Sequence, residues 1–137
     1  MIVRCKSTRS DDDLLRERDF GVVLGREYLV LGLTINVASH ALPRGAWVDI
    51  LMEPDIPTLL NVPLSLFEIV DPRPSGYWEV RLFDEGMIRL QPASFYRESY
   101  MEDLSDREPE SIEDFWRVYK MMQAEGATST RPSQTVS

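Results

Sequence analysis

Hydrophobic and polar residues alternate through the first two thirds of the chain and take a helical spacing after that. The clearest strand pattern covers residues 25–35, which begin and end near glycine, are rich in β-branched and aromatic residues and contain no proline. Both alternating rows are apolar: Tyr28 and Val30 form one, and the other is Leu29, Leu31, Leu33 and Ile35. We therefore expect this strand to be buried on both faces.

Further strands are predicted at residues 1–5, 46–52, 59–62 and 66–70, separated by loops that contain proline or glycine. Residues 77–83 and 87–90 then indicate a hairpin. Pairing Leu82 with Ile88 and Val80 with Leu90 keeps the apolar rows on one face, whereas a slip of one residue would turn one of these rows outward.

This register leaves a three-residue loop in which Gly86 supplies the left-handed residue that such loops require. It turns Trp78, Val80 and Leu82 inward. On the outer face Arg81 meets Arg89, and Glu79 lies diagonally to offset the two like charges.

After Pro92 the period changes, and residues 93–104 are predicted to form a short helix. A second helix follows, with Pro109 in its first turn and Gly126 at its end. Its apolar residues recur at helical spacing: Ile112, Phe115, Trp116, Tyr119 and Met122.

The resulting expectation is one domain over residues 1–126, β-rich over 1–91 and helical over 93–126, with a disordered tail at 127–137. The chain has 137 residues, 43% of them hydrophobic, and no apolar run of membrane-spanning length. No secretory signal is recognised at the N-terminus. Cys5 is the single cysteine, which fits a reducing compartment, and we expect a cytoplasmic protein.

Residues that carry reactive chemistry are few. His40 has no accompanying nucleophile motif, and Cys5 alternates with Val3 as a buried structural thiol would. The run 11–13 is three aspartates without the ligand spacing of a calcium loop. The three tryptophans are expected in the core or at its edge. We therefore expect neither an enzyme nor a bound metal or cofactor.

Charge is the more informative property. The net charge is −8, which opposes nucleic-acid binding; it either steers the protein toward a basic partner or serves solubility alone. Residues 97–125 hold nine acidic and four basic residues, and so carry −5 of that charge. The acidic residues are densest across the turn between the two predicted helices. This acidic stretch has two interpretations: an ordinary solvated surface, or a docking surface for a cationic protein.

The order of three segments, residues 1–5, 25–33 and 63–71, resembles that of small bacterial immunity proteins of polymorphic or contact-dependent toxin systems. The likeness rests on the sequences MIVRC, GREYLVLGL and PLSLFEIVD and extends through residues 77–90 into the acidic helices. It implies an α+β fold, a small SH3-like antiparallel β-barrel or curled sheet followed by a β-hairpin and two C-terminal helices.

The same resemblance implies function. A non-catalytic immunity protein binds and neutralises a cognate toxin, often a nuclease, by covering its basic cleft with an acidic surface. We expect that surface to comprise Glu102, Asp103, Asp106, Glu108, Glu110, Glu113 and Asp114.

Two alternatives stay open. An SH3-like adaptor that binds a peptide or protein partner predicts that Tyr28, Trp47, Tyr77 or Trp78 cluster on an open surface. A small enzyme predicts that His40 converges with Asp49 or Glu53 in a pocket.

Overall fold

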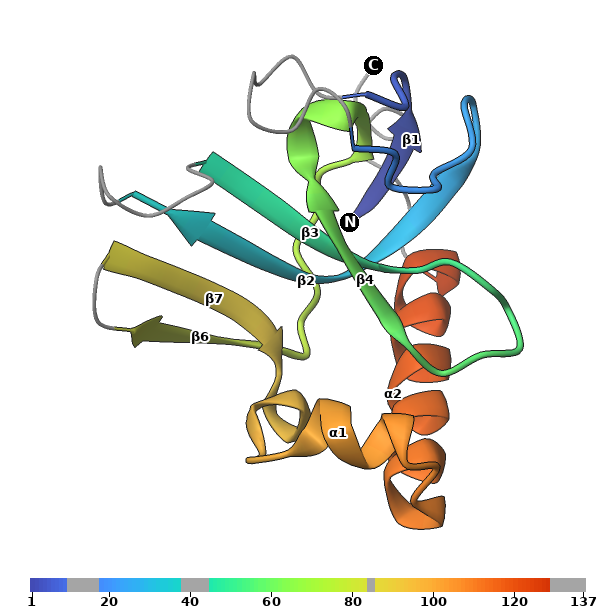
Figure 1. Cartoon of the computed structure of the whole chain (residues 1–137), viewed down its shortest axis with the longest axis vertical. Helices are drawn as coiled ribbons and strands as arrows, with labels where there is room; N and C mark the ends of the chain where they lie inside the picture. Colours follow the sequence, from blue (N-terminus) through green and yellow to red (C-terminus); the bar gives the residue numbers. More distant parts are fainter. Residues whose placement is uncertain (10–17, 38–44, 84–85, 129–137) are drawn as a thin grey trace.

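Antiparallel strands form one sheet, which helices follow in the chain (Figure 1). The computed structural model describes residues 1–9, 18–37, 45–83 and 86–128. The strands in these ranges are β1 (Ile2–Cys5), β2 (Glu27–Asn36), β3 (Gly45–Leu51), β4 (Leu59–Pro63), β5 (Phe67–Asp71), β6 (Trp78–Phe83) and β7 (Met87–Pro92). The helices are α1 (Tyr100–Ser105) and α2 (Pro109–Thr128).

The long strand β2 organises the sheet. One edge of β2 pairs with β3, and β4 continues the sheet beyond β3. The other edge pairs with β1 near the start of β2 and with β7 near its end, and β5 and β6 lie outside these two. The expected mixed α+β class is confirmed, but among the described residues the sheet is not closed, so a closed barrel is not formed.

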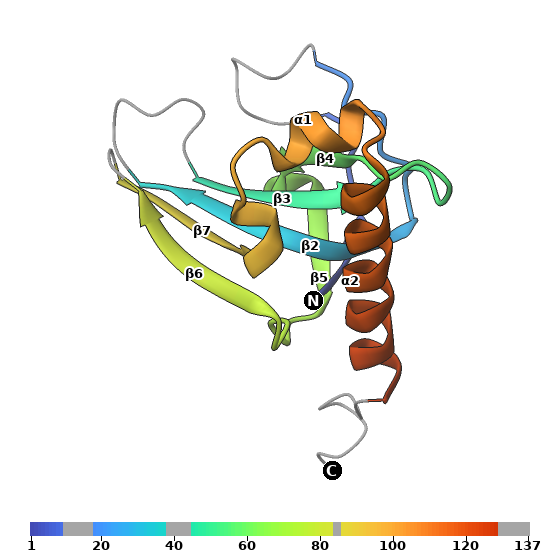
Figure 2. The ribbon, with the colours of Figure 1, turned by 90° about the horizontal axis from the view of Figure 1, so that it is seen from below.

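The expectation that β2 is buried on both faces is confirmed. Tyr28 and Val30 belong to one apolar cluster, which also contains residues of β1, β3, β4 and β5. Leu31 belongs to a second cluster, which lies between the sheet and the helices. Figure 2 shows α2 running past the sheet, with α1 leading into it.

A β-bulge interrupts the simple alternation of side chains along β2. Val30 pairs with Ile50 and Gly32 with Asp49, so Leu31 is an extra residue without a partner on β3. A bulge shifts the following side chains by one face. Leu33 therefore packs against the cluster that contains Val30 rather than the one that contains Leu31.

The predicted hairpin register is confirmed, since Leu82 pairs with Ile88, Val80 with Leu90 and Arg81 with Arg89. Gly86 has the expected positive φ, 77°. Glu79, however, bonds Arg81 on its own strand rather than Arg89.

The expectation that the row from Trp78 to Leu82 points into the core is wrong for two of its residues. Trp78 is half-buried, but Val80 is 58% exposed and Leu82 is 77% exposed. The alternation of residues along a strand decides which face of the sheet each side chain occupies. It does not show whether another element covers that face. Within the described ranges β6 pairs with β7 alone, so its side chains have a neighbouring strand on one side instead of two and are less shielded from solvent.

The helical region also departs from expectation at two points. The helix predicted over residues 93–104 is divided into a 3₁₀ turn (Ala93–Tyr96) and α1, because Ser99 takes a left-handed conformation with φ of 64°. The second helix begins at Pro109 as predicted but passes through Gly126 to Thr128. Residues 127–128 of the tail expected at 127–137 therefore belong to α2, and residues 129–137 lie outside the described residues.

Candidate protein-binding surface

The seven acidic residues singled out in the sequence lie on α1, on the start of α2 and on the turn between them, which we call the acidic corner. The turn is a Schellman motif. The Arg107 amide donates to the Leu104 carbonyl (3.1 Å) and the Glu108 amide to the Asp103 carbonyl (2.9 Å). Arg107 takes the left-handed conformation that this motif requires, with φ of 59°. The motif ends α1 and fixes the direction in which α2 starts.

Five carboxylates of the acidic corner face solvent: Glu102, Asp106, Glu108, Glu110 and Glu113. Within the described ranges, the side chains of these five form no ion pair or hydrogen bond. Their charges are therefore uncompensated at short range. Glu102 and Glu110 also lie in the first turns of their helices, where the helix dipole stabilises a negative side chain.

The other two carboxylates are half-buried and serve the fold. Asp103 lies 3.5 Å from the guanidinium of Arg97, which also donates to the Ser111 hydroxyl (2.6 Å). Asp114 accepts hydrogen bonds from the Tyr100 hydroxyl (2.9 Å) and from Arg117 (2.5 Å). These two groups hold α1 and α2 together, so they are less accessible to a partner than the other five.

Electrostatics around Asp114 agree with this structural role. Burial acts to raise the pKa of Asp114, but the hydrogen-bond donors around it, Tyr100 and Arg117 among them, outweigh burial and lower that pKa. Burial, and then the bond to Asp114, raise the pKa of Tyr100. The pair therefore remains carboxylate and neutral phenol through the neutral pH range.

An aromatic stack supports the acidic corner from beneath. Phe95 lies between Tyr100, with ring centroids 5.0 Å apart, and Phe115, with centroids 5.9 Å apart. Phe115 is fully buried and Tyr100 is 2% exposed. The surface carboxylates thus stand on helices that are packed against the sheet rather than on free loops.

The aromatic residues that an adaptor would use do not share an open surface. Tyr28 and Trp47 are buried, at 4% and 6% exposure, and Trp78 is half-buried. Trp47 packs edge-on against Phe20 with centroids 6.2 Å apart. Tyr77 alone among these four is exposed.

The residues on which an enzyme would depend are only partly described. His40 and residues 11–13 lie outside the described ranges. Asp49 is buried and accepts a hydrogen bond from the Asn61 amide (2.9 Å), and burial raises the pKa of Asp49. Burial likewise raises the pKa of the Cys5 thiol, which donates to the Ser7 carbonyl (3.3 Å), as expected for a structural thiol.

Within the described part of the chain, no three His, Cys, Asp or Glu side chains are grouped so that they could hold a metal ion. No helix in those ranges is long and apolar enough to cross a bilayer.

The sequence patterns missed two polar sites on the sheet. One is a groove of about 380 Å³ whose lining residues are Arg18, Thr34, Asn36, Trp47, Leu60, Asn61, Met87 and Arg89. No local sequence signal joins these residues, because most of them come from the four strands β2, β3, β4 and β7.

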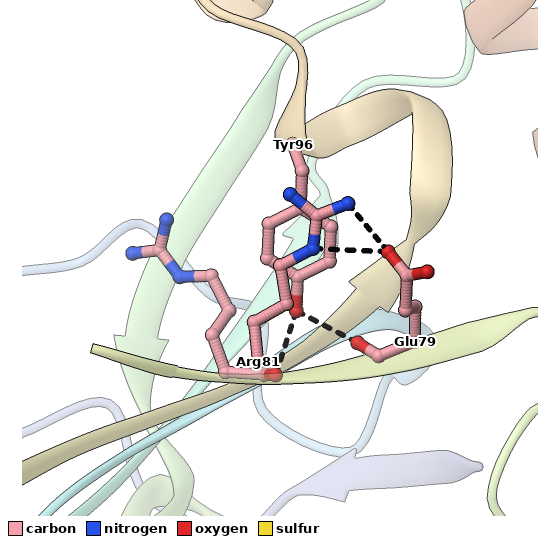
Figure 3. Close-up of polar contacts among 4 residues, drawn as sticks. Glu79, Arg81 and Tyr96 are labelled. Atoms are coloured by element: carbon pink, nitrogen blue, oxygen red, sulfur yellow. Dashed lines mark hydrogen bonds and ion pairs between the residues drawn. The ribbon is translucent and has the colours of Figure 1, made fainter.

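The second site lies on the β6–β7 hairpin (Figure 3). Arg81 covers the Tyr96 ring at 4.2 Å and donates to Glu79 from Nε (3.0 Å) and Nη2 (2.7 Å). The Tyr96 hydroxyl lies 2.7 Å from the Glu79 carbonyl and 2.6 Å from the Arg89 carbonyl. No local sequence signal joins Tyr96 to these two strands.

Comparison with known proteins adds no further assignment, because no family model, curated protein or solved structure matches the chain.

Proposed function

We propose that this protein is a non-catalytic immunity protein, which binds and neutralises a cognate bacterial toxin with a basic surface. The observation that supports this proposal most directly is the set of five exposed carboxylates at the acidic corner, which have no ion-pair partner in the described ranges. A cationic partner would supply the missing counter-charges. Inhibition then requires only that the partner's basic cleft is covered.

The scaffold is suited to this role. The acidic corner rests on the stacked rings of Phe95, Tyr100 and Phe115, so the backbone that carries its carboxylates is ordered. A surface that is ordered before binding loses less conformational entropy when the partner docks. Uncompensated like charges also accelerate encounter with an oppositely charged partner.

The fold and the location form part of the same proposal. The long strand β2, shared by the two arms of a curled sheet, supports an SH3-like origin for the β-rich part. The single buried cysteine supports a cytoplasmic location. The adaptor alternative has less support, because two of its four aromatic residues are buried.

The test begins with the protein encoded by the adjacent gene. We expect its expression to be toxic, co-expression of the full chain to remove the toxicity, and the two purified proteins to bind by calorimetry. An adjacent product that is harmless and does not bind would contradict the immunity proposal.

The surface assignment has its own test. Replacing Glu102 and Glu113 by lysine changes the charge by +4 within the acidic corner, and we expect the dissociation constant to rise by about tenfold or more. Replacing Glu53 and Asp55, which are exposed in the β3–β4 connection, makes the same charge change elsewhere. Equal losses for both double variants, or no loss for the first, would overturn the acidic corner as the binding surface.

A further inference from the structure

Strand β6 and the residue before it expose an unusual amount of apolar surface. Tyr77 is 43% exposed, Val80 58%, Leu82 77% and Phe83 44%. In the described ranges β6 pairs with β7 and with no other strand. An open strand edge beside exposed apolar side chains is the arrangement to which another strand adds.

The backbone of β6 has groups available for such an addition. In an antiparallel pair, alternate residues direct their N–H and C=O groups toward the neighbour. The two residues of a hydrogen-bonded antiparallel pair donate their N–H groups to each other. Trp78 pairs with Pro92, which has no N–H, so this pair is not of the hydrogen-bonded kind. Trp78, Val80 and Leu82 therefore belong to the set whose backbone groups face away from β7. Glu79, Arg81 and Phe83 belong to the set that faces β7.

The side chains of this segment are complementary to a second copy of the same segment. When two copies run antiparallel with Val80 opposite Val80, every other pair of facing residues is complementary in charge or is apolar on both sides. Opposite charges meet where Glu79 lies opposite Arg81. The remaining pairs are apolar or aromatic: Trp78 with Leu82, and Tyr77 with Phe83.

Neighbouring registers lack this match. A shift of two residues in one direction places Arg81 opposite Arg81, and in the other direction places Glu79 opposite Glu79. Like charges directly opposite each other are destabilising. A shift of one residue brings Val80 opposite a charged residue and mixes the two faces. The sequence 77–83 therefore specifies a single antiparallel self-pairing.

We propose that two copies of this chain associate through antiparallel pairing of β6 with β6, about a two-fold axis at Val80. Each Glu79 already bonds Arg81 on its own strand, and the second copy converts the two pairs into a square of alternating charges. The exposed row of Val80 and Leu82 becomes continuous across the two sheets. A contact of one strand is smaller than a standard interface, so we expect dimerisation at roughly micromolar or higher concentrations.

Cross-linking through introduced cysteines tests the register. In the proposed dimer the two Val80 Cα atoms are about 5.5 Å apart, within the range that a disulfide spans. Two Leu82 residues are offset by four positions, roughly 13 Å along the strand. The native Cys5 is buried, at 2% exposure, and does not interfere.

We expect full-length Val80→Cys to form a covalent dimer under mild oxidation at least tenfold faster than Leu82→Cys. Random collision predicts the opposite order, because Leu82 is the more exposed of the two side chains. Equal rates, or faster cross-linking of Leu82→Cys, would overturn the proposed pairing.

Charge exchange provides a second test by sedimentation velocity. Glu79→Arg and Arg81→Glu each place like charges opposite one another and should abolish the dimer, whereas the double variant restores complementarity and should dimerise like the wild type. A wild type that stays monomeric to several hundred micromolar would refute the proposal, and so would a double variant that behaves like the single ones. Neither test uses a toxin, so its outcome is separate from that of the proposed function.

Discussion

The indole of Trp78 donates a hydrogen bond from Nε1 to the main-chain carbonyl of Leu31, with the two atoms 3.0 Å apart. Leu31 is the extra residue of the β-bulge in β2, and Trp78 begins β6. The Trp78 ring also contacts both apolar clusters. One side chain therefore connects the irregular point of the central strand to the outer hairpin.

Replacing Trp78 by phenylalanine removes this hydrogen bond and keeps much of the apolar contact. We expect the free energy of unfolding to fall by about 1–2 kcal/mol, since the Leu31 carbonyl loses a donor in a partly buried site. Chemical denaturation measures the change. Trp116→Phe is the matched control, because the Trp116 indole packs against an apolar cluster but forms no hydrogen bond in the described ranges. A loss no larger than that of the control would contradict the importance of the bond.

The space beside Gly32 is closed. A Cβ atom there would lie 2.8 Å from Asp49 Oδ2 and 3.3 Å from the Leu90 carbonyl oxygen. Gly32→Ala should therefore destabilise the protein by about 1–3 kcal/mol. Gly126→Ala, at a helical position with nothing within 4 Å, should leave stability unchanged or raise it by up to about 1 kcal/mol. Thermal or denaturant unfolding of the two variants should show opposite or clearly unequal shifts.

Stability should fall on acidification through Asp71. Arg73 donates to this buried carboxylate from Nε (2.9 Å) and Nη2 (2.5 Å) and lowers the pKa of Asp71 from 3.8 to about 2. Because the pKa is lower in the folded protein than in the unfolded chain, the stabilisation is complete above about pH 5. It is lost as the pH falls from about 4 toward 2, and it amounts to roughly 2 kcal/mol.

Arg73→Gln tests this assignment in unfolding experiments from pH 2 to pH 7. The variant should be less stable at neutral pH and should lose less stability on acidification than the wild type. Arg4→Gln removes the exposed pairs with Glu27 and Glu68 and should have a small effect at every pH. Parallel pH curves for the wild type and Arg73→Gln would rule out the Asp71 explanation.

The Tyr96 hydroxyl should stabilise the hairpin locally. Removing it by Tyr96→Phe takes a donor from the Glu79 and Arg89 carbonyl oxygens, so we expect amide hydrogen exchange in β6 to accelerate by about fivefold or more. Tyr119→Phe is the control, since no hydrogen bond of that hydroxyl is present in the described ranges. Unchanged exchange in β6 of the Tyr96 variant would show that the aromatic contacts suffice.

Arg107 is held in a left-handed conformation that glycine adopts without steric cost. Arg107→Gly should consequently be more stable than Arg107→Ala by about 1 kcal/mol, and both variants remove the same charge. At Lys120, exposed within α2, the order should reverse, because alanine is the better residue inside a helix. The same order at both positions would argue against the Schellman turn.

Local patterns predicted much of this fold. The period-two alternation and the turn residues specified the hairpin register from Leu82–Ile88 to Val80–Leu90, and Pro109 marked the start of α2. The spacing of charged residues also located the acidic corner. These features depend on interactions between residues that are near in sequence, and such interactions can be predicted from the spacing of residue types.

Other features were beyond such patterns. The predicted helix over residues 93–104 overlooked Ser99, a serine that adopts a glycine-like conformation. Among the seven candidate carboxylates, the pattern of charges did not show that Asp103 and Asp114 are half-buried whereas the other five are exposed. Arg97 and Arg117, their ion-pair partners, are near in sequence, but the packing of α1 on α2 places Tyr100 against Asp114 and buries this part of the acidic corner.

Patterns along the chain specified the order of the strands, the start of α2, the register of the hairpin and the concentration of negative charge near the helices. Three other features depend on tertiary packing: the bulge at Leu31, the hydrogen bond between Tyr100 and Asp114, and the exposure of Val80 and Leu82. All three have one cause. Periodicity specifies the direction of a side chain, whereas its burial and its partners depend on elements that lie far away along the chain.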